Sequence, residues 1–181
     1  DAHDSWRNNP LISSSIAPHA PYTVSDRSLE KVITYAEQLA LGLHTHLHET
    51  LEEISRSESQ YGMRPLARLA KLGLLGPDLL AAHGVHLLDY EMDMLAAYGC
   101  HIAHCPSSNL KLASGMAPVV DLLAKGVNVA LGTDGAASNN RLDIFSEIRL
   151  AALFAKGVSA DASALPAMQA LAMATINGAK A

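Results

Sequence analysis

Aromatic residues and positive charge are both in short supply in this sequence. Only 4% of the 181 residues are Phe, Trp or Tyr, so a hydrophobic core has to be assembled mainly from Ala, Leu, Val, Ile and Met. The formal net charge is -5 and the basic residues are scattered, which argues against a nucleic-acid partner. No apolar run reaches the roughly 18 residues of a membrane-spanning helix. We therefore expect a globular protein that has neither nucleic acid nor membrane as its partner.

Cysteine is equally rare, whereas histidine is abundant. The two cysteines, Cys100 and Cys105, are too few for a disulfide framework, so we expect the reducing cytoplasm as the location. The sequence has nine histidines, and most of them form tight groups: His44, His46 and His48; His83 and His86; His101 and His104. Neutral imidazole is a common zinc ligand, so these groups indicate metal chemistry.

Short apolar runs alternate with longer helical stretches along the chain. The apolar runs predict strands at residues 11–17, 43–47, 79–82, 101–104 and 127–131. Helices are expected at residues 25–40, in a region up to residue 72 that is interrupted near Gly62, and at 88–98, 118–125, 143–155 and 165–174. Ser25 is expected to cap the first helix and Gly42 to stop it. This repeated strand–helix order predicts a parallel sheet with helices outside it.

The polar residues at the strand ends decide between two arrangements of such a sheet. An open doubly wound sheet concentrates its ligands at one switch point, whereas a barrel gathers the ends of all its strands around one centre. Here every strand is followed by polar residues, namely His19, the 44–49 cluster, His83, His104 and Asp134. We therefore predict the α/β class, as a partial (β/α)8 TIM-type barrel. Residues 1–181 are expected to form a single partial domain whose N-terminal strands are missing.

The densest cluster is His-Thr-His-Leu-His-Glu, at residues 44–49. Side chains two residues apart share one face of a strand, so His44, His46 and His48 are predicted to point the same way. Metal ligation would explain at least one of them, and the alternative is that one or two are hydrogen-bonded core histidines. Spacing alone does not say which histidine binds a metal. Glu49, at the end of the strand, could reach a ligand or could instead supply charge to a helix N-terminus.

Other candidate residues also follow strands. Asp134 follows the 127–131 strand and precedes small residues, and a buried carboxylate there implies a metal or another cation, although a capping role is the alternative. His83 ends the 79–82 run, and His19 lies between two prolines in a position that suits substrate contact. Residues 104–115 are interpreted as a polar loop, in which nothing supports Cys105 as a nucleophile.

A catalytic zinc takes about three protein ligands and a water. One histidine of the 44–48 strand and Asp134 are the ligands that the residues themselves suggest. The remaining ligands are expected from strands outside this sequence. We also expect that these 181 residues alone lack useful activity, and that their open sheet edges promote self-association into a homo-oligomer.

Several motifs make the chain resemble a known family. APHAPYTVS, HLHET, YGMRPLARLAKLGLLGP, HCPSSNLKLASG, LGTDGAASNN and ATINGA are similar to segments of the amidohydrolase superfamily. Within it, they resemble the 5′-methylthioadenosine/S-adenosylhomocysteine deaminases and their chlorohydrolase-like relatives. The resemblance implies about strands 4–8 of the barrel. It also implies metal-dependent hydrolytic deamination of an adenine-type nucleoside, with one divalent metal, Zn²⁺ or alternatively Fe²⁺.

The resemblance also implies a role for each candidate residue. His46 matches a metal ligand, and Asp134 matches a metal ligand that is also the general base. Glu49 matches the carboxylate that shuttles a proton to the purine ring. His83 matches the histidine that orients the attacking hydroxide, and His19 one that contacts the purine. The His-x-His pair and the ribose-binding carboxylate of the family's N-terminal half do not occur in this sequence.

Two alternatives remain open at this point. One is another amidohydrolase, such as a guanine or 8-oxoguanine deaminase or a triazine hydrolase, because the strands of these enzymes are alike. The other, of a different class, is a non-catalytic binding domain with an open sheet and structural histidines. Substrate profiling separates the first alternative from a nucleoside deaminase, and metal analysis separates the second.

Overall fold

The computed structural model describes residues 2–6 and 8–181, which contain one parallel sheet. Its five strands lie in the order in which they occur along the chain. They are β1 (Ser15–Ile16), β2 (Gly42–Leu47), β3 (Leu79–His83), β4 (His101–His104) and β5 (Asn128–Leu131). Each strand therefore pairs with its neighbour in the sequence, as in one continuous segment of a barrel wall.

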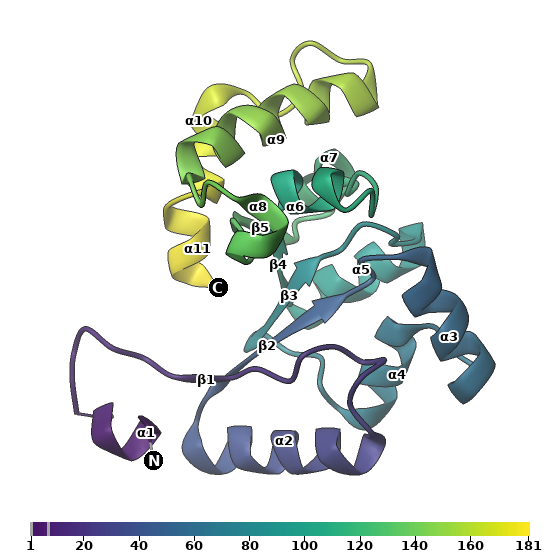
Figure 1. Ribbon diagram of the computed structural model, residues 1–181, viewed down its shortest axis with the longest axis vertical. Helices are drawn as coiled ribbons and strands as arrows, with labels where there is room; N and C mark the ends of the chain where they lie inside the picture. The colour runs from purple at the N-terminus through teal and green to yellow at the C-terminus, as the bar shows by residue number, and fades with distance from the viewer. Residues whose placement is uncertain (1, 7) are drawn as a thin grey trace.

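Helices connect the strands and follow the last one. They are α1 (Ala2–Trp6), α2 (Asp26–Leu39), α3 (Leu51–Tyr61), α4 (Pro65–Leu72), α5 (Asp89–Tyr98), α6 (Pro106–Lys111), α7 (Val119–Ala124), α8 (Ala136–Asn139), α9 (Ile144–Ser159), α10 (Ala167–Met173) and α11 (Ile176–Lys180). Figure 1 shows most of them around one side of the sheet, from α2 at the bottom through α3, α4 and α5 on the right to α9 at the top, whereas α1 and α11 lie on the left. This is the predicted α/β fold, a partial TIM-type barrel. Within the described part of the chain, no helix combines the length and the apolar character needed to cross a membrane.

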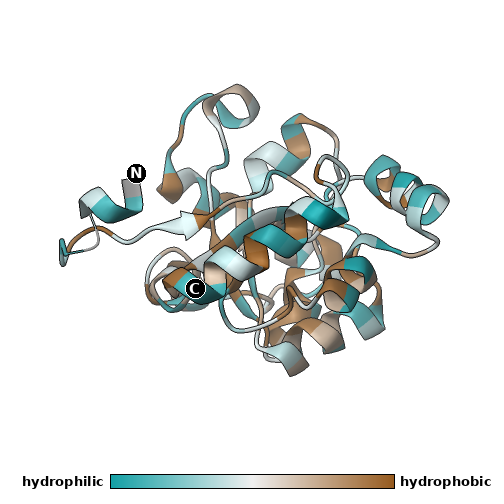
Figure 2. Cartoon of the chain, turned by 90° about the horizontal axis from the view of Figure 1, so that it is seen from below, coloured by the Kyte–Doolittle hydropathy of each residue, from teal (hydrophilic) through white to brown (hydrophobic). Residues whose placement is uncertain are grey.

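The two faces of the sheet differ, as the alternation along β2 illustrates. Leu43, Thr45 and Leu47 are buried, whereas His44 and His46 between them are partly exposed. The buried face packs against the helices in a core of aliphatic residues that includes Leu66, Leu95, Ile102, Leu122 and Val129. Figure 2 shows helices that are hydrophobic on one side and hydrophilic on the other. The histidines therefore lie on the face that a barrel turns towards its axis.

The first strand is much shorter than predicted. The expected strand at residues 11–17 contracts to the two residues of β1, which pair with Gly42 and Leu43. Pro18, just after this segment, has no backbone N–H to donate to a neighbouring strand. At the other end Leu11 is 92% exposed, so the serine-rich segment between them has no apolar face to bury. The polar end of this strand nevertheless leads into the loop that carries His19.

The prediction of a polar loop after β4 is also wrong. Residues Pro106–Lys111 form α6, with Pro106 in its first turn, where a missing N–H costs nothing. The short helices α1, α8 and α11 were not predicted, because each is too brief to show a periodic pattern. The first long helix begins after its Ser25 cap as expected, but it ends at Ala40 in a left-handed conformation, and Gly42 already belongs to β2.

The ATINGA motif lies against the last strand. The Asn177 side-chain amide on α11 donates to the carbonyl oxygen of Val129 (2.9 Å), and the Asn177 carbonyl accepts from the Asn128 side chain (2.9 Å). These bonds satisfy backbone and side-chain groups of β5 that pairing with β4 does not use. The motif therefore holds the C-terminal helix against the sheet.

Candidate metal centre

The three histidines that follow one another in and after β2 do not share a face. His44 and His46 do, but His48 lies beyond the strand with φ 55° and is 0% exposed. Its Nδ1 donates to the His86 carbonyl oxygen (3.1 Å), and its Nε2 accepts from the Leu66 N–H (3.0 Å). The prediction for His48 is therefore wrong, because the positive φ turns its ring away from the other two.

His48 serves the fold through its neutral ring. Burial lowers its pKa to about 4, against an opposing effect of Glu91. Both ring nitrogens are occupied, which joins α4 to the loop after β3. Arg64 supports the same loop, donating to the His86 carbonyl (2.6 Å) and to both oxygens of Glu91 (2.8 and 2.9 Å). His48 is thus one of the hydrogen-bonded core histidines that remained an alternative.

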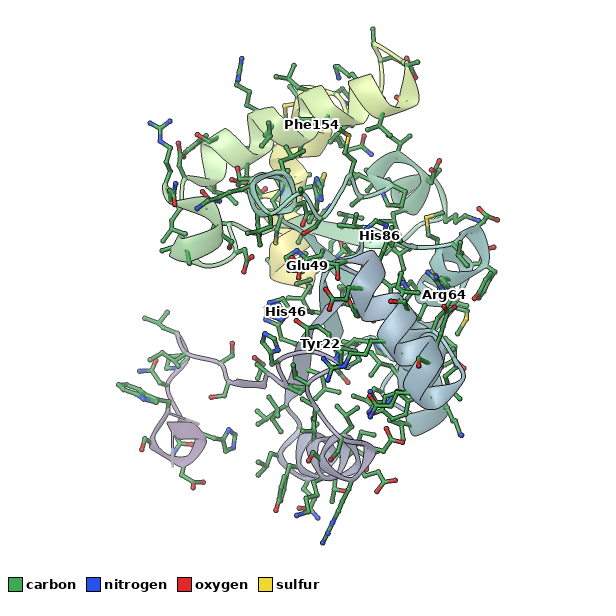
Figure 3. All side chains as sticks on the ribbon, turned by 45° about the vertical axis from the view of Figure 1, so that its right-hand side comes forward. Tyr22, His46, Glu49, Arg64, His86 and Phe154 are labelled. Carbon is green, nitrogen blue, oxygen red and sulfur yellow. The ribbon has the colours of Figure 1, made fainter. Side chains whose placement is uncertain are left out.

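His46 is oriented by the loop that follows β1. Its Nδ1 lies 2.6 Å from the His19 carbonyl oxygen, which also accepts from the His46 backbone N–H (3.1 Å). A carbonyl can only accept, so Nδ1 carries the proton and Nε2 is left with a free lone pair. The rings of His19 and His46 lie 4.9 Å apart. Figure 3 shows His46 between Glu49 and Tyr22.

His83 reaches the same point by a turn of the backbone. Strict alternation after Leu79 and Ala81 would aim it at the helices, but its φ is 76° and its ring stacks on His46 at 5.2 Å. Its Nδ1 bonds to Oδ1 of Asn109 (2.8 Å), and both side chains are buried. Nε2 therefore faces the centre, 3.7 Å from Glu49 Oε2.

Asp134 approaches from the end of β5 with one oxygen already occupied. Its φ is 59°, and its Oδ2 accepts hydrogen bonds from Ser108 Oγ (2.7 Å) and Ser138 Oγ (2.8 Å). Burial raises the pKa of this carboxyl, but these two hydroxyls, a backbone hydrogen bond from Gly135 and the charge of His83 together lower it below its ordinary value. Asp134 is thus held as a carboxylate, and the two serines leave its Oδ1 unoccupied.

These residues form a donor set that fits a divalent metal. One ligand atom from each of His46, His83 and Asp134 lies within 4.8 Å of the other two. Two imidazoles and a carboxylate are ligands that zinc accepts, and three protein ligands leave a position open for water. Each of the three has its other polar atom held by a hydrogen bond, which is how metal ligands are normally oriented. The sequence had suggested only His46 and Asp134 for this role.

Glu49 lies beside these three side chains, and the helix that follows it does not use it as a cap. Helix α3 is capped by Thr50, and Glu53 accepts from the backbone N–H groups of His48 (3.0 Å) and Glu49 (2.8 Å). Glu49 instead accepts from Ser114 Oγ (3.1 Å), and its side chain is 18% exposed. A carboxylate this sheltered and this close to His83 can exchange protons with a bound molecule.

The sequence reasoning missed the residues that orient the centre. Ser108, Asn109 and Ser114 all come from the HCPSSNLKLASG segment, and they contact Asp134, His83 and Glu49 respectively. Its length and its small polar residues were the available signal. Cys105 in the same segment is not a nucleophile of this site, because burial, followed by the charge of Asp134, raises its pKa to about 12.

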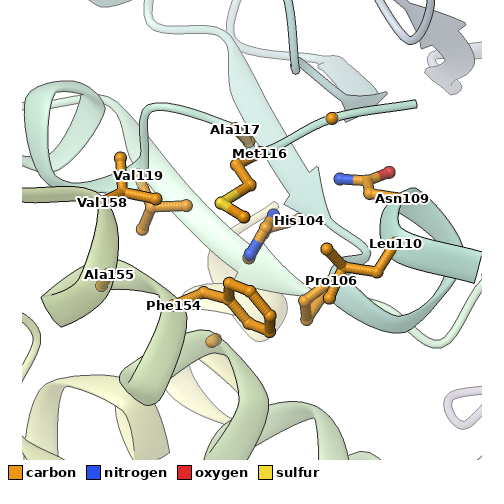
Figure 4. A pocket seen from close by; sticks show the side chains of 12 residues that line it. His104, Pro106, Asn109, Leu110, Met116, Ala117, Val119, Phe154, Ala155 and Val158 are labelled. Carbon is orange, nitrogen blue, oxygen red and sulfur yellow. The ribbon is translucent and has the colours of Figure 1, made fainter. Parts of the chain in front are cut away.

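A small apolar cavity lies near the centre but is distinct from it. Figure 4 shows the His104 ring surrounded by Met116, Phe154 and Pro106. Its volume of about 20 Å³ has room for about one water molecule and is far too small for a nucleoside. Burial, followed by the charge of His83, lowers the pKa of His104 to about 4, so its ring is neutral.

The lowered pKa of His104 predicts that the fold loses stability in acid. Below its ordinary pKa of 6.5 the unfolded chain binds a proton that the folded chain refuses until about pH 4, so stability falls as the pH drops through this window. His104→Leu should flatten the dependence of the free energy of unfolding on pH by up to about 1.4 kcal/mol per pH unit. Urea unfolding at pH 7, 6 and 5 with a chelator present measures both slopes. Parallel slopes would contradict the prediction.

Comparisons with known proteins place this geometry among hydrolases. A family model described as "Amidohydrolase family" matches residues 3–181. A 5-methylthioadenosine/S-adenosylhomocysteine deaminase from Teredinibacter turnerae is 54% identical over 98% of this chain and 40% of its own length. The chain thus spans about two fifths of the length of this curated relative.

Solved structures agree in fold. An adenosine deaminase from Xanthomonas campestris with bound zinc superposes with a TM-score of 0.96 and 52% identity, over 98% of this chain and 40% of that one. A variant of atrazine chlorohydrolase from Arthrobacter aurescens, complexed with zinc and atraton, gives a TM-score of 0.92 and 27% identity, over 99% and 41%. The greater sequence identity is with the deaminase.

Proposed function

The chain belongs to the amidohydrolase family, and from this premise we propose that it forms the hydrolytic centre of a metal-dependent aminohydrolase. The proposed reaction is the release of ammonia from an adenine-type nucleoside, namely 5′-methylthioadenosine, S-adenosylhomocysteine or adenosine. The names of the relatives support this substrate class. The observation that carries the proposal is the convergence of His46, His83 and Asp134 within 4.8 Å, with Glu49 beside them.

His46 and Asp134 would hold the metal, which we propose to be zinc, with ferrous iron as the alternative. A bound divalent metal supplies Lewis acidity that brings the pKa of water near 7. The atoms available for this role are His46 Nε2, which the His19 carbonyl does not contact, and Asp134 Oδ1, which the two serines do not occupy. His83 is the third side chain within reach, and its Nε2 could complete the ligand set or bond to the attacking oxygen.

Asp134 and Glu49 would divide the proton transfers. Asp134 is ionised, because its pKa is lowered, so its carboxylate is available to take the proton of the attacking water and pass it to the leaving amine. Glu49 would protonate the purine ring nitrogen, so that negative charge does not build up there while the ring carbon becomes tetrahedral. Ser114 would keep the Glu49 carboxyl in place through its hydrogen bond.

His19 would contact the purine. Its Nδ1 lies 3.0 Å from Thr23 Oγ1, which donates its own proton to the Ala20 carbonyl and therefore accepts from His19. The His19 Nε2 is thereby left as an acceptor. An acceptor at this place suits a donor group of the substrate, next to the His46 ring.

The test is ammonia release by the purified protein with added zinc. We expect turnover of 5′-methylthioadenosine or S-adenosylhomocysteine with a kcat/KM of at least about 10⁴ M⁻¹s⁻¹, and much slower turnover of guanine and atrazine. Preference for guanine or a triazine would replace the substrate class, and a protein that binds no divalent metal would remove the proposal.

A further inference from the structure

A buried arginine lies beneath the loop that carries His19. Arg68 is on α4, its side chain is 2% exposed, and its Cζ lies 3.7 Å from the centroid of the Tyr61 ring. A guanidinium in the interior is costly unless its N–H groups find acceptors. The acceptors that Arg68 contacts therefore indicate what it holds.

All of these acceptors belong to one segment between β1 and the start of α2. Arg68 Nε donates to Asp26 Oδ1 (2.7 Å), Nη2 donates to the Val24 carbonyl (2.9 Å), and Nη1 donates to the Pro21 carbonyl. The planar, forked guanidinium reaches three points in different directions, which the single ammonium of a lysine cannot reproduce. The loop is therefore fixed at three points by a residue from a distant helix.

The same loop orients two side chains of the centre. Thr23, between the fixed points, accepts the hydrogen bond from His19 Nδ1 (3.0 Å). The His19 carbonyl accepts from His46 Nδ1 (2.6 Å) and so leaves the His46 Nε2 free. A loop displaced by even a fraction of an ångström would weaken both hydrogen bonds.

We propose that Arg68 is a positioning residue of the metal centre, which it serves by fixing the loop that orients His19 and His46. The part of the inference that concerns His19 rests on the proposed function, because it assumes that His19 contacts the purine. The part that concerns His46 rests on the hydrogen bonds alone, so a measurement of zinc binding tests it without any substrate.

The experiment compares Arg68→Met and Arg68→Lys with Arg149→Met, a control at an exposed arginine of α9. Zinc affinity is measured by competition with a chelator, and kcat and KM with the nucleoside that the parent protein deaminates. Arg68→Met should lower zinc affinity about 10–100-fold, the usual effect of losing a group that supports a metal ligand. Arg68→Lys should recover part of this loss, and the control none of it. Zinc affinity and KM equal to those of the parent in folded Arg68→Met would overturn the proposal.

Two milder variants keep the test decisive if Arg68→Met does not fold. Asp26 is 48% exposed, so Asp26→Ala removes one acceptor of Arg68 with little cost to the core. It should lower zinc affinity several-fold, and unchanged affinity would overturn the proposal. Thr23→Val removes the hydrogen bonds of its hydroxyl to the His19 ring and the Ala20 carbonyl but leaves the bond between His19 and His46, so it should raise KM while zinc affinity stays the same. A parent protein that binds zinc but deaminates no adenine nucleoside would remove the proposed function, while the zinc measurements would still decide the role of Arg68.

Discussion

Asp134→Asn is expected to lower kcat by about 10²–10⁴-fold while the chain keeps its fold. The amide oxygen can still accept from Ser108 and Ser138, so the local hydrogen bonds survive. An amide carries no charge, however, so it is a poor metal ligand and cannot take a proton from water. Steady-state kinetics with 5′-methylthioadenosine and the zinc content of the purified variant measure the two losses.

The matched control is Asp78→Asn, which changes an exposed aspartate just before the start of β3. It lies at the opposite end of that strand from His83, so we expect parental kinetics. Circular dichroism of both variants checks that the fold is kept. Near-parental kcat in Asp134→Asn would rule out its role as base and ligand.

Glu49→Gln is expected to have a similarly large effect, again about 10²–10⁴-fold on kcat. The glutamine can still accept the hydrogen bond of Ser114, but it cannot deliver a proton to the purine ring. The zinc content should stay at the parental level, since Glu49 lies outside the group of His46, His83 and Asp134 that could hold the metal. This difference separates the role of Glu49 from that of Asp134.

Glu52→Gln is the control for charge at the start of α3. Glu52 lies in the first turn of α3, three residues after Glu49, and is exposed, so Glu52→Gln removes the same charge near the helix N-terminus without touching the centre. We expect parental kcat. If both variants lost activity equally, the effect would come from the helix terminus, and the catalytic role of Glu49 would be abandoned.

The fold followed closely from the sequence because its elements have regular patterns. The run at residues 127–131 is apolar and β-branched, and it became β5 (Asn128–Leu131). Pro65 after Gly62 predicted the restart of a helix, and α4 begins there. The identification of His46, His83, Glu49 and Asp134 as strand-end residues was enough to place them at one edge of a parallel sheet, where the structure brings them together.

The details of the centre could not be predicted in the same way. His48 and His83 both have a positive φ, which residue type does not announce for a histidine, and in each case the ring leaves the face that alternation assigns to it. Ser108 and Asn109 lie on a helical turn too short to be recognised. Their contacts with Asp134 and His83 depend on packing between elements that no local pattern encodes.

The left-handed backbone at His83 (φ 76°) and Asp134 (φ 59°) lowers stability at two positions of the candidate metal centre. A non-glycine residue held in this conformation typically costs about 1 kcal/mol or more of folding free energy, which glycine would avoid. Selection for thermal stability alone would therefore favour replacing these two residues, and selection for activity would retain them. A stabilised form of this protein should accordingly be sought through substitutions in the helices, with the backbone of these two positions left under strain.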